Sequence, residues 1–135
     1  MPYTDGETPV SIVRVDDRGL IDWRYRTDAV VGLEEAQQEV QIIAGIMKEL
    51  GLEQSFLLID IRRIKRIDRE ARQLFASREI HDSYGVQALS LLMGSPLSTF
   101  IGNFWFAINR PLHPTRLFSD EENARVWLET YIESD

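Results

Sequence analysis

The sequence predicts an α/β domain with a mixed sheet, an antiparallel hairpin near its N-terminal end and about four helices. Two observations predict this class. From about residue 33 onward, short β-forming runs alternate with segments of helical periodicity, which is typical of a parallel sheet with right-handed crossovers. Before that point, two β-forming runs are joined by turn-forming residues, which indicates a hairpin. The 135 residues contain no internal repeat and no Pro- or Gly-rich linker, so we expect a single domain over residues 10–135.

The N-terminal part begins with a short lead-in. Residues 1–9 are polar and contain two prolines and a glycine, and we expect them to be flexible. Residues 10–15 and 20–25 are the two strands of the expected hairpin. The Asp-Asp-Arg-Gly sequence at 16–19 supplies the turn between them.

The first helix is expected over residues 33–50, because apolar residues recur there at steps of three and four. Gly51 follows at a position where helices end in a left-handed conformation. The apolar stripe consists of Leu33, Ala36, Val40, Ile43, Met47 and Leu50, and the polar residues expected outside it include Glu34, Glu35, Gln38 and Glu39.

A buried strand and a second helix are expected next. Residues 56–61 form a nearly unbroken apolar run, as in a strand covered on both faces. A basic loop follows, and Asp68 is placed to cap a helix that ends before Gly85. Residues 86–93 form the next expected strand.

The last part of the chain repeats this alternation. Residues 97–108 show helical periodicity, and residues 116–118 form a short strand candidate. The sequence Ser-Asp-Glu-Glu at 119–122 has the pattern of a capping box. It predicts a final helix whose apolar stripe contains Ala124, Trp127, Leu128 and Tyr131.

Bulk composition restricts the classes of function. The chain has no cysteine, which excludes disulfides and thiolate metal sites and fits a cytoplasmic protein. No apolar run approaches the roughly 20 residues that cross a bilayer. The net charge of −7 argues against nucleic acid or anionic membrane as a general partner.

One basic segment interrupts the acidic chain. Residues 60–72 contain six basic and three acidic side chains, a local charge of +3, so the other residues together carry −10. Arginine forks match carboxylate and phosphate geometry. The segment is therefore a candidate site for an acidic protein surface or a small anionic ligand, or alternatively a solvated helix start with internal ion pairs. The candidate residues are Arg63, Lys65, Arg66, Arg69 and Arg72.

Two carboxylates flank this segment. Asp68 is expected to cap the helix, and Asp60, at the end of an apolar strand, is expected to hold the loop through backbone hydrogen bonds. A general-base role is conceivable for either residue, but no other catalytic constellation accompanies them.

The aromatic run Phe104, Trp105 and Phe106 is a second candidate surface. On a helix, Phe104 faces the core, Trp105 lies at its flank and Phe106 points nearly the opposite way. We expect a self-association surface, such as that of a homodimer, or one wall of a ligand groove. The alternatives are burial of Phe106 under the loop at 110–114 or a helix that ends before Phe106.

Metal and cofactor chemistry is not expected. His81 and His113 have no further histidine or cysteine at ligand spacing, and there is no glycine-rich phosphate loop or nucleophile elbow. We therefore expect a protein without a cofactor and without enzymatic activity.

Two stretches of the sequence resemble the STAS superfamily, the fold of bacterial anti-sigma-factor antagonists, and especially its uncharacterised single-domain branch. One is Leu58-Ile59-Asp60-Ile61 with Ile64 and Ile67-Asp68, which is similar to the family's strand–loop–helix pattern. The other is the sequence of residues 118–128, which is similar to its closing capped helix. The resemblance implies a STAS-like topology and a non-catalytic regulatory module that binds a protein partner.

One residue departs from the family pattern. In antagonists that are switched by phosphorylation, a serine or threonine directly follows the aspartate that opens the helix, whereas this chain has Arg69 there. A guanidinium accepts no phosphate, so we expect switching by partner or ligand binding instead. A small-molecule or lipid-like ligand, held in an apolar pocket with a basic rim, is the alternative function.

Overall fold

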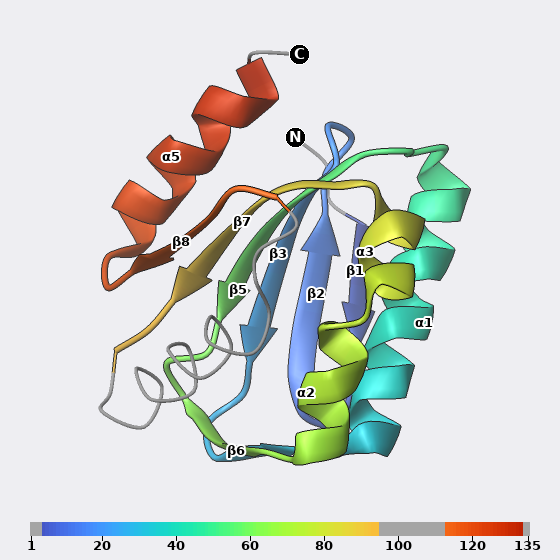
Figure 1. Ribbon diagram of the computed structural model, residues 1–135, viewed down its shortest axis with the longest axis vertical. Coiled ribbons are helices and arrows are strands. Elements are labelled where there is room, and N and C mark those ends of the chain that lie inside the picture. Colours follow the sequence, from blue (N-terminus) through green and yellow to red (C-terminus); the bar gives the residue numbers. More distant parts are fainter. Residues whose placement is uncertain (1–3, 95–112, 134–135) are drawn as a thin grey trace.

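The computed structural model describes residues 4–94 and 113–133 (Figure 1). These residues form twelve elements, and the helix and strand labels follow Figure 1. In chain order they are β1 (Thr4–Glu7), β2 (Ser11–Val15), β3 (Leu20–Tyr25), β4 (Ala29–Val31), α1 (Leu33–Leu50), β5 (Ser55–Asp60), β6 (Ile64–Ile67), α2 (Arg69–Phe75), α3 (Arg78–Tyr84), β7 (Val86–Leu92), β8 (Thr115–Phe118) and α5 (Glu121–Glu133).

A six-stranded mixed sheet forms the centre of the fold, with the strand order β1-β2-β3-β5-β7-β8. The first three strands are antiparallel neighbours, and β3, β5, β7 and β8 run parallel. This arrangement confirms the predicted mixed sheet with an N-terminal hairpin. A second, two-stranded parallel sheet joins β4 to β6 and was not predicted.

Helices cover both faces of the main sheet. Alternate residues of a strand point to opposite faces. On one face, Leu57 and Ile59 of β5 belong to the larger apolar core, together with buried residues of α1 and α2. On the other face, Phe56 and Leu58 pack against α5. Figure 1 shows α5 well apart from α1, α2 and α3.

Helix α1 has the predicted bounds, and Gly51 ends it in the predicted left-handed conformation, with φ of 68°. Its buried face differs from the predicted stripe. Leu33 and Leu50, its first and last residues, are 41% and 37% exposed, whereas Glu39 is completely buried. The expectation that Glu39 lies on the polar side of the helix is therefore wrong.

The segment after β5 contains more elements than predicted. The basic loop includes a strand, β6, which pairs with β4. The single helix expected from Asp68 to Gly85 is two helices, α2 and α3. They separate where the Ser77 hydroxyl accepts a hydrogen bond from the backbone N–H of Ile80 at 3.3 Å. Serine competes in this way with helical backbone bonds, which favours a break.

Both ends of the described chain also differ in detail. Thr4–Glu7, within the expected flexible lead-in, form strand β1 at the sheet edge. Helix α5 begins at Glu121, and Asp120 rather than Ser119 accepts the capping bond from Asn123 at 3.2 Å. The helix expected over 97–108 lies outside the described residues.

Among the described helices, none is long and apolar enough to cross a membrane.

Gly85 allows the tight connection between α3 and β7. Its φ is +57°, and a Cβ atom there would lie 1.9 Å from the carbonyl oxygen of Glu53. We expect Gly85→Ala to lower the free energy of unfolding by at least about 2 kcal/mol, because left-handed strain and backbone overlap add. Urea unfolding measures this loss. The control is Gly45→Ala on α1, where nothing lies within 4 Å and helix propensity predicts a gain of about 0.5–1 kcal/mol. An unchanged midpoint for Gly85→Ala would contradict the strained turn.

Candidate partner-binding surface

The basic segment of the sequence is presented by strand β6. Ile64 and Ile67 are buried, whereas Lys65 and Arg66 between them are exposed. The two isoleucines belong to the main apolar core, so β6 is anchored at both ends while its cationic side chains face solvent. Hydrophobic burial of the isoleucines therefore fixes the position of the charges.

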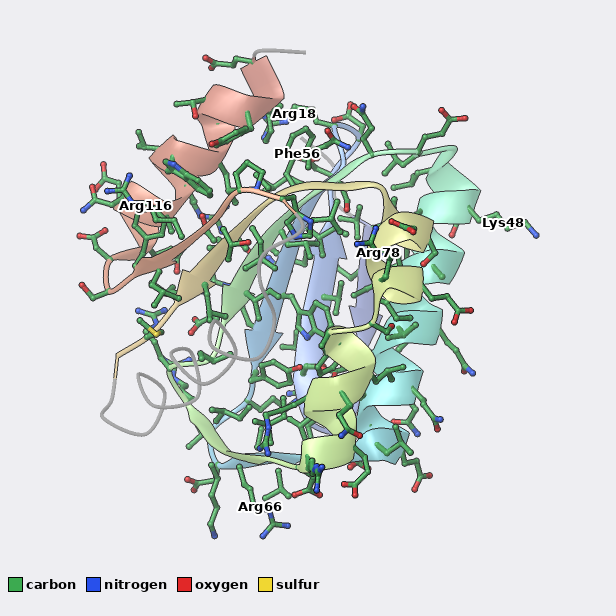
Figure 2. All side chains as sticks on the ribbon, in the orientation of Figure 1. Arg18, Lys48, Phe56, Arg66, Arg78 and Arg116 are labelled. Atoms are coloured by element: carbon green, nitrogen blue, oxygen red, sulfur yellow. The ribbon has the colours of Figure 1, made fainter. Side chains whose placement is uncertain are left out.

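Four of the five predicted basic residues are exposed here. We call Arg63, Lys65, Arg66 and Arg69 the basic surface. Figure 2 shows Arg66 at the end of the molecule formed by β6 and the start of α2. The fifth residue, Arg72, is half-buried and donates from Nη1 to the carbonyl oxygen of Ile67 at 2.7 Å. This bond gives Arg72 a structural contact, and its predicted role in partner binding stays a prediction.

Asp68 does not cap α2 through its side chain. It occupies the N-cap position with extended backbone angles, but its carboxylate makes no capping hydrogen bond. Instead, its Oδ1 accepts from Nε of Arg66 at 2.9 Å. The two side chains are 36% and 66% exposed, and such exposed pairs contribute at most about 1 kcal/mol. This pair therefore holds Arg66 only weakly.

Asp60 organises the turn between β5 and β6. Its Oδ1 accepts from the backbone N–H of Arg62 at 3.0 Å, the type of loop-holding bond that the sequence suggests. Its Oδ2 pairs with the Arg62 guanidinium at 2.8 Å. Since Asp60 is 4% exposed and already paired, it is placed to support the turn.

Arg62 belongs to an ionic cluster on the α5 side of the sheet. The cluster alternates three arginines with three carboxylates, which come from β3, the end of β5 and the turn after it, and the first turns of α5. The three positive and three negative charges balance. The arginines lower the pKa of Glu121 to about 2, mainly through the hydrogen bond that Arg24 donates to it. The members of this α5 ionic cluster are Asp22, Arg24, Asp60, Arg62, Glu121 and Arg125.

Sequence reasoning missed this cluster because its members are distant along the chain. Arg24 and Glu121 are 97 residues apart, and their guanidinium and carboxylate groups lie 2.8 Å apart. Only the packing of α5 on the sheet brings them together. The cluster therefore fixes α5, whereas the basic surface lies on a different element and is not part of it.

A small apolar cavity lies between the sheet and the helices α2 and α3. Its volume is about 30 Å³, roughly a tenth or less of the 300–1,000 Å³ of typical ligand pockets. The walls are aromatic and aliphatic side chains from β3, β5, β6, α2, α3 and β7, including Trp23, Tyr25, Phe75 and Tyr84. The cavity is thus a packing void of the core at its present size.

The other predicted surface lies outside the described residues. Phe104, Trp105 and Phe106 all fall in the segment 95–112, so their predicted roles in self-association or a ligand groove stay predictions. Within the described ranges, no group of three or more His, Cys, Asp or Glu side chains is arranged to hold a metal ion.

A buried acidic side chain is the most notable residue that the sequence reasoning misassigned. Glu39 of α1 accepts hydrogen bonds from Nε1 of Trp23 at 2.9 Å, from the Tyr25 hydroxyl at 3.1 Å and from the Ser11 hydroxyl. Burial raises its pKa to about 7, and the three donors partly oppose this rise. The available signal was its spacing: Glu39 lies three residues after Ala36 and four before Ile43, both buried on the same helix face.

Solved structures resemble this fold at low sequence identity. An uncharacterized protein from Shewanella loihica PV-4, of the DUF3478 family and with a SpoIIAA-like fold, aligns with a TM-score of 0.60 and 12% identity. The alignment covers 94% of this chain and 92% of that one. The anti-sigma factor antagonist SpoIIAA in its unphosphorylated form aligns with a TM-score of 0.56 and 15% identity, over 95% of this chain and 98% of that one. These likenesses confirm the predicted STAS-like fold.

Comparison by sequence gives a family but no curated relative. No curated protein matches the chain. A family model, described as a domain of unknown function (DUF7793), matches residues 14–132, which is most of the chain. The protein therefore belongs to the DUF7793 family and has a SpoIIAA-like fold.

Proposed function

We propose that this chain is a non-catalytic regulatory module of the cytoplasm that binds an acidic protein partner through its basic surface. The observation that carries the proposal is the exposure of Arg63, Lys65, Arg66 and Arg69 at one end of a protein with a net charge of −7. An acidic surface of a partner would be attracted to this end and repelled by the rest of the molecule.

The contrast with other arginines supports this choice of surface. Arg24 and Arg125 are held in the α5 ionic cluster, and Arg18 donates to Asp16 and Glu129 at 3.0 and 2.9 Å. These side chains stabilise the fold and would lose those bonds on meeting a partner. In the basic surface, by contrast, Arg66 is held by one exposed ion pair.

The fold and one residue indicate the kind of regulation. Among the solved structures of similar fold is the anti-sigma factor antagonist SpoIIAA in its unphosphorylated form. In this chain Arg69 is the first residue of α2 and is exposed. A phosphorylated residue would carry a charge of about −1.5 to −2 there, whereas arginine carries a permanent positive charge. We therefore propose that binding depends on charge complementarity and not on phosphorylation at this position.

A lipid-like ligand receives less support from the described residues. The cavity of about 30 Å³ holds roughly one water molecule, whereas a lipid chain needs a pocket many times larger. Its wall is almost wholly apolar, and the cationic side chains of the basic surface point to solvent instead. Protein binding therefore remains the better-supported function.

Charge reversal tests the proposal. We expect R66E/R69E to lose at least about tenfold in the amount of any specific protein partner that tagged wild-type chain captures from its host, as measured by quantitative mass spectrometry. The matched control is K48E/R78E, which changes the net charge equally at two exposed residues of α1 and α3. Equal loss in both variants, or no loss in R66E/R69E, would contradict the proposed surface.

A further inference from the structure

A chain of polar side chains crosses the core between α1 and the sheet. The Thr8 hydroxyl oxygen lies 2.8 Å from that of Ser11, and Ser11 donates to Oε2 of Glu39. Trp23 and Tyr25 of β3 donate to the same carboxylate. Thr8, Ser11 and Glu39 are 6%, 0% and 0% exposed. One carboxylate thus joins β2 and β3 to α1.

The backbone fixes the direction of this chain. The Thr8 hydroxyl oxygen already accepts from the N–H groups of Val10 at 3.2 Å and Ser11 at 2.9 Å. A hydroxyl has one proton and two acceptor positions, so Thr8 donates its proton to Ser11. Ser11 in turn donates to Glu39. The three side chains described as bonded to the carboxylate, Ser11, Trp23 and Tyr25, therefore each present a hydrogen to it, an arrangement that suits an ionised Glu39.

The described hydrogen bonds to Glu39 come from uncharged donors only. Ser11 faces it from β2, and Trp23 and Tyr25 face it from β3. Charge interactions link it to Glu35 on its own helix and to Tyr84 on α3. From α2, the ring of Phe75 packs against that of Trp23, with 5.3 Å between the ring centroids. The half-buried Arg72 of α2 directs Nη1 to the Ile67 carbonyl oxygen.

Two opposing effects therefore act on one buried group. Burial favours the neutral acid, whereas three hydrogen-bond donors favour the carboxylate. A protonated Glu39 carries an O–H group that needs a hydrogen-bond acceptor. The hydroxyl of Ser11 or Tyr25 would have to turn its own hydrogen away so that its oxygen could accept this bond. The core cavity lies against Trp23 and Tyr25, which gives these side chains room to move.

The polar chain also reaches the surface. Thr8 lines an open groove between the end of β1 and α1, whose other lining residues are Glu7, Pro9, Gln38, Gln41 and Ile42. Solvent in this groove is therefore one hydroxyl away from Ser11. Proton exchange with the buried carboxylate needs only local opening at this point.

We infer that Glu39 is a proton-operated switch: gain of a proton breaks the Ser11–Trp23–Tyr25 bonding pattern and changes how Trp23 packs against Phe75 of α2. The inference does not depend on the proposed partner. It concerns the link between α1, β3 and α2, and α2 begins with Arg69 of the basic surface, two residues after the end of β6.

Nuclear magnetic resonance of the full chain tests the switch. The probe is the indole N–H signal of Trp23, assigned with the Trp23→Phe variant. We expect it to titrate once between about pH 5 and about pH 9, together with the backbone amide of Phe75, with a midpoint near 7. The titration should vanish in Glu39→Gln and persist in the control Glu34→Gln, an exposed carboxylate on the same helix.

Two results would overturn the inference: a Trp23 signal that is constant over this range, or one that still titrates in Glu39→Gln. If Glu39→Gln does not fold, the carboxyl carbon of Glu39 in the wild-type chain decides the question. A midpoint near 7 that coincides with the Trp23 titration supports the switch. A midpoint near the ordinary value of 4.5 contradicts it.

Discussion

Truncation of Trp23 to alanine should lower the free energy of unfolding by about 4 kcal/mol. The indole is 3% exposed, packs edge-on against Phe75 and donates to Glu39. Its removal enlarges the cavity that it already lines and leaves the buried carboxylate with one donor fewer. Chemical denaturation, with the slope checked for two-state behaviour, measures the loss.

Two further variants separate the contributions of Trp23. Trp23→Phe keeps a ring but removes the N–H donor, so we expect a loss of roughly 1.5–3 kcal/mol when Glu39 is ionised. Trp127→Ala removes a half-buried indole from α5 and should cost less than Trp23→Ala. Equal destabilisation by Trp23→Ala and Trp127→Ala would contradict the claim that Trp23 contributes more to the stability of the core than Trp127 does.

The stability of the wild-type chain should fall as pH rises from 4.5 to about 7. Over this range the folded state holds a proton on Glu39 that the unfolded state has released, so raising the pH favours unfolding. The expected fall is roughly 3 kcal/mol, and stability should level off above about pH 7. Urea unfolding at a series of pH values measures the profile.

Glu121 acts in the opposite direction at lower pH. The pKa of Glu121 is lowered to about 2, so its stabilising contribution is complete above 4.5 and is lost as pH falls toward 2. The wild-type profile should therefore have a maximum near pH 4.5. In Glu39→Gln the fall above this pH should disappear, whereas Glu34→Gln should keep it. A Glu39→Gln profile that parallels the wild type would contradict the assignment.

Local patterns in the sequence predict most of the fold. Helix α1 and its end at Gly51 follow from apolar spacing and from the glycine's left-handed conformation. Strand β5 follows from an unbroken apolar run, and all six of its residues are buried. These features depend on neighbours in sequence, which is why periodicity and capping residues are sufficient to find them.

Features that depend on tertiary contacts were missed. Glu39 was placed on the polar side of α1 because a single carboxylate is normally exposed, and its three donors come from strands that the helix meets only in the fold. Strand β6 lies where the sequence predicted a basic loop, and its two central residues, Lys65 and Arg66, are both exposed, which breaks the alternation typical of a strand. Its pairing with β4 includes a register shift, which accommodates them.

The sequence predicted the part of the candidate site that depends on neighbours along the chain, and missed the part that depends on tertiary contacts. Charge clustering along the chain identified the basic surface, since its four residues lie within seven positions. It could not show that Arg72 turns inward to the carbonyl oxygen of Ile67, because that bond depends on the angle between β6 and α2.

The most direct test of the proposed function is the footprint of a captured partner on this chain. Backbone amide hydrogen exchange, measured with and without the partner, reports which segments become protected. Our account predicts added protection at residues 63–69, and its loss in R66E/R69E. Protection confined to α5 and β8, with residues 63–69 exchanging as in the free protein, would contradict it.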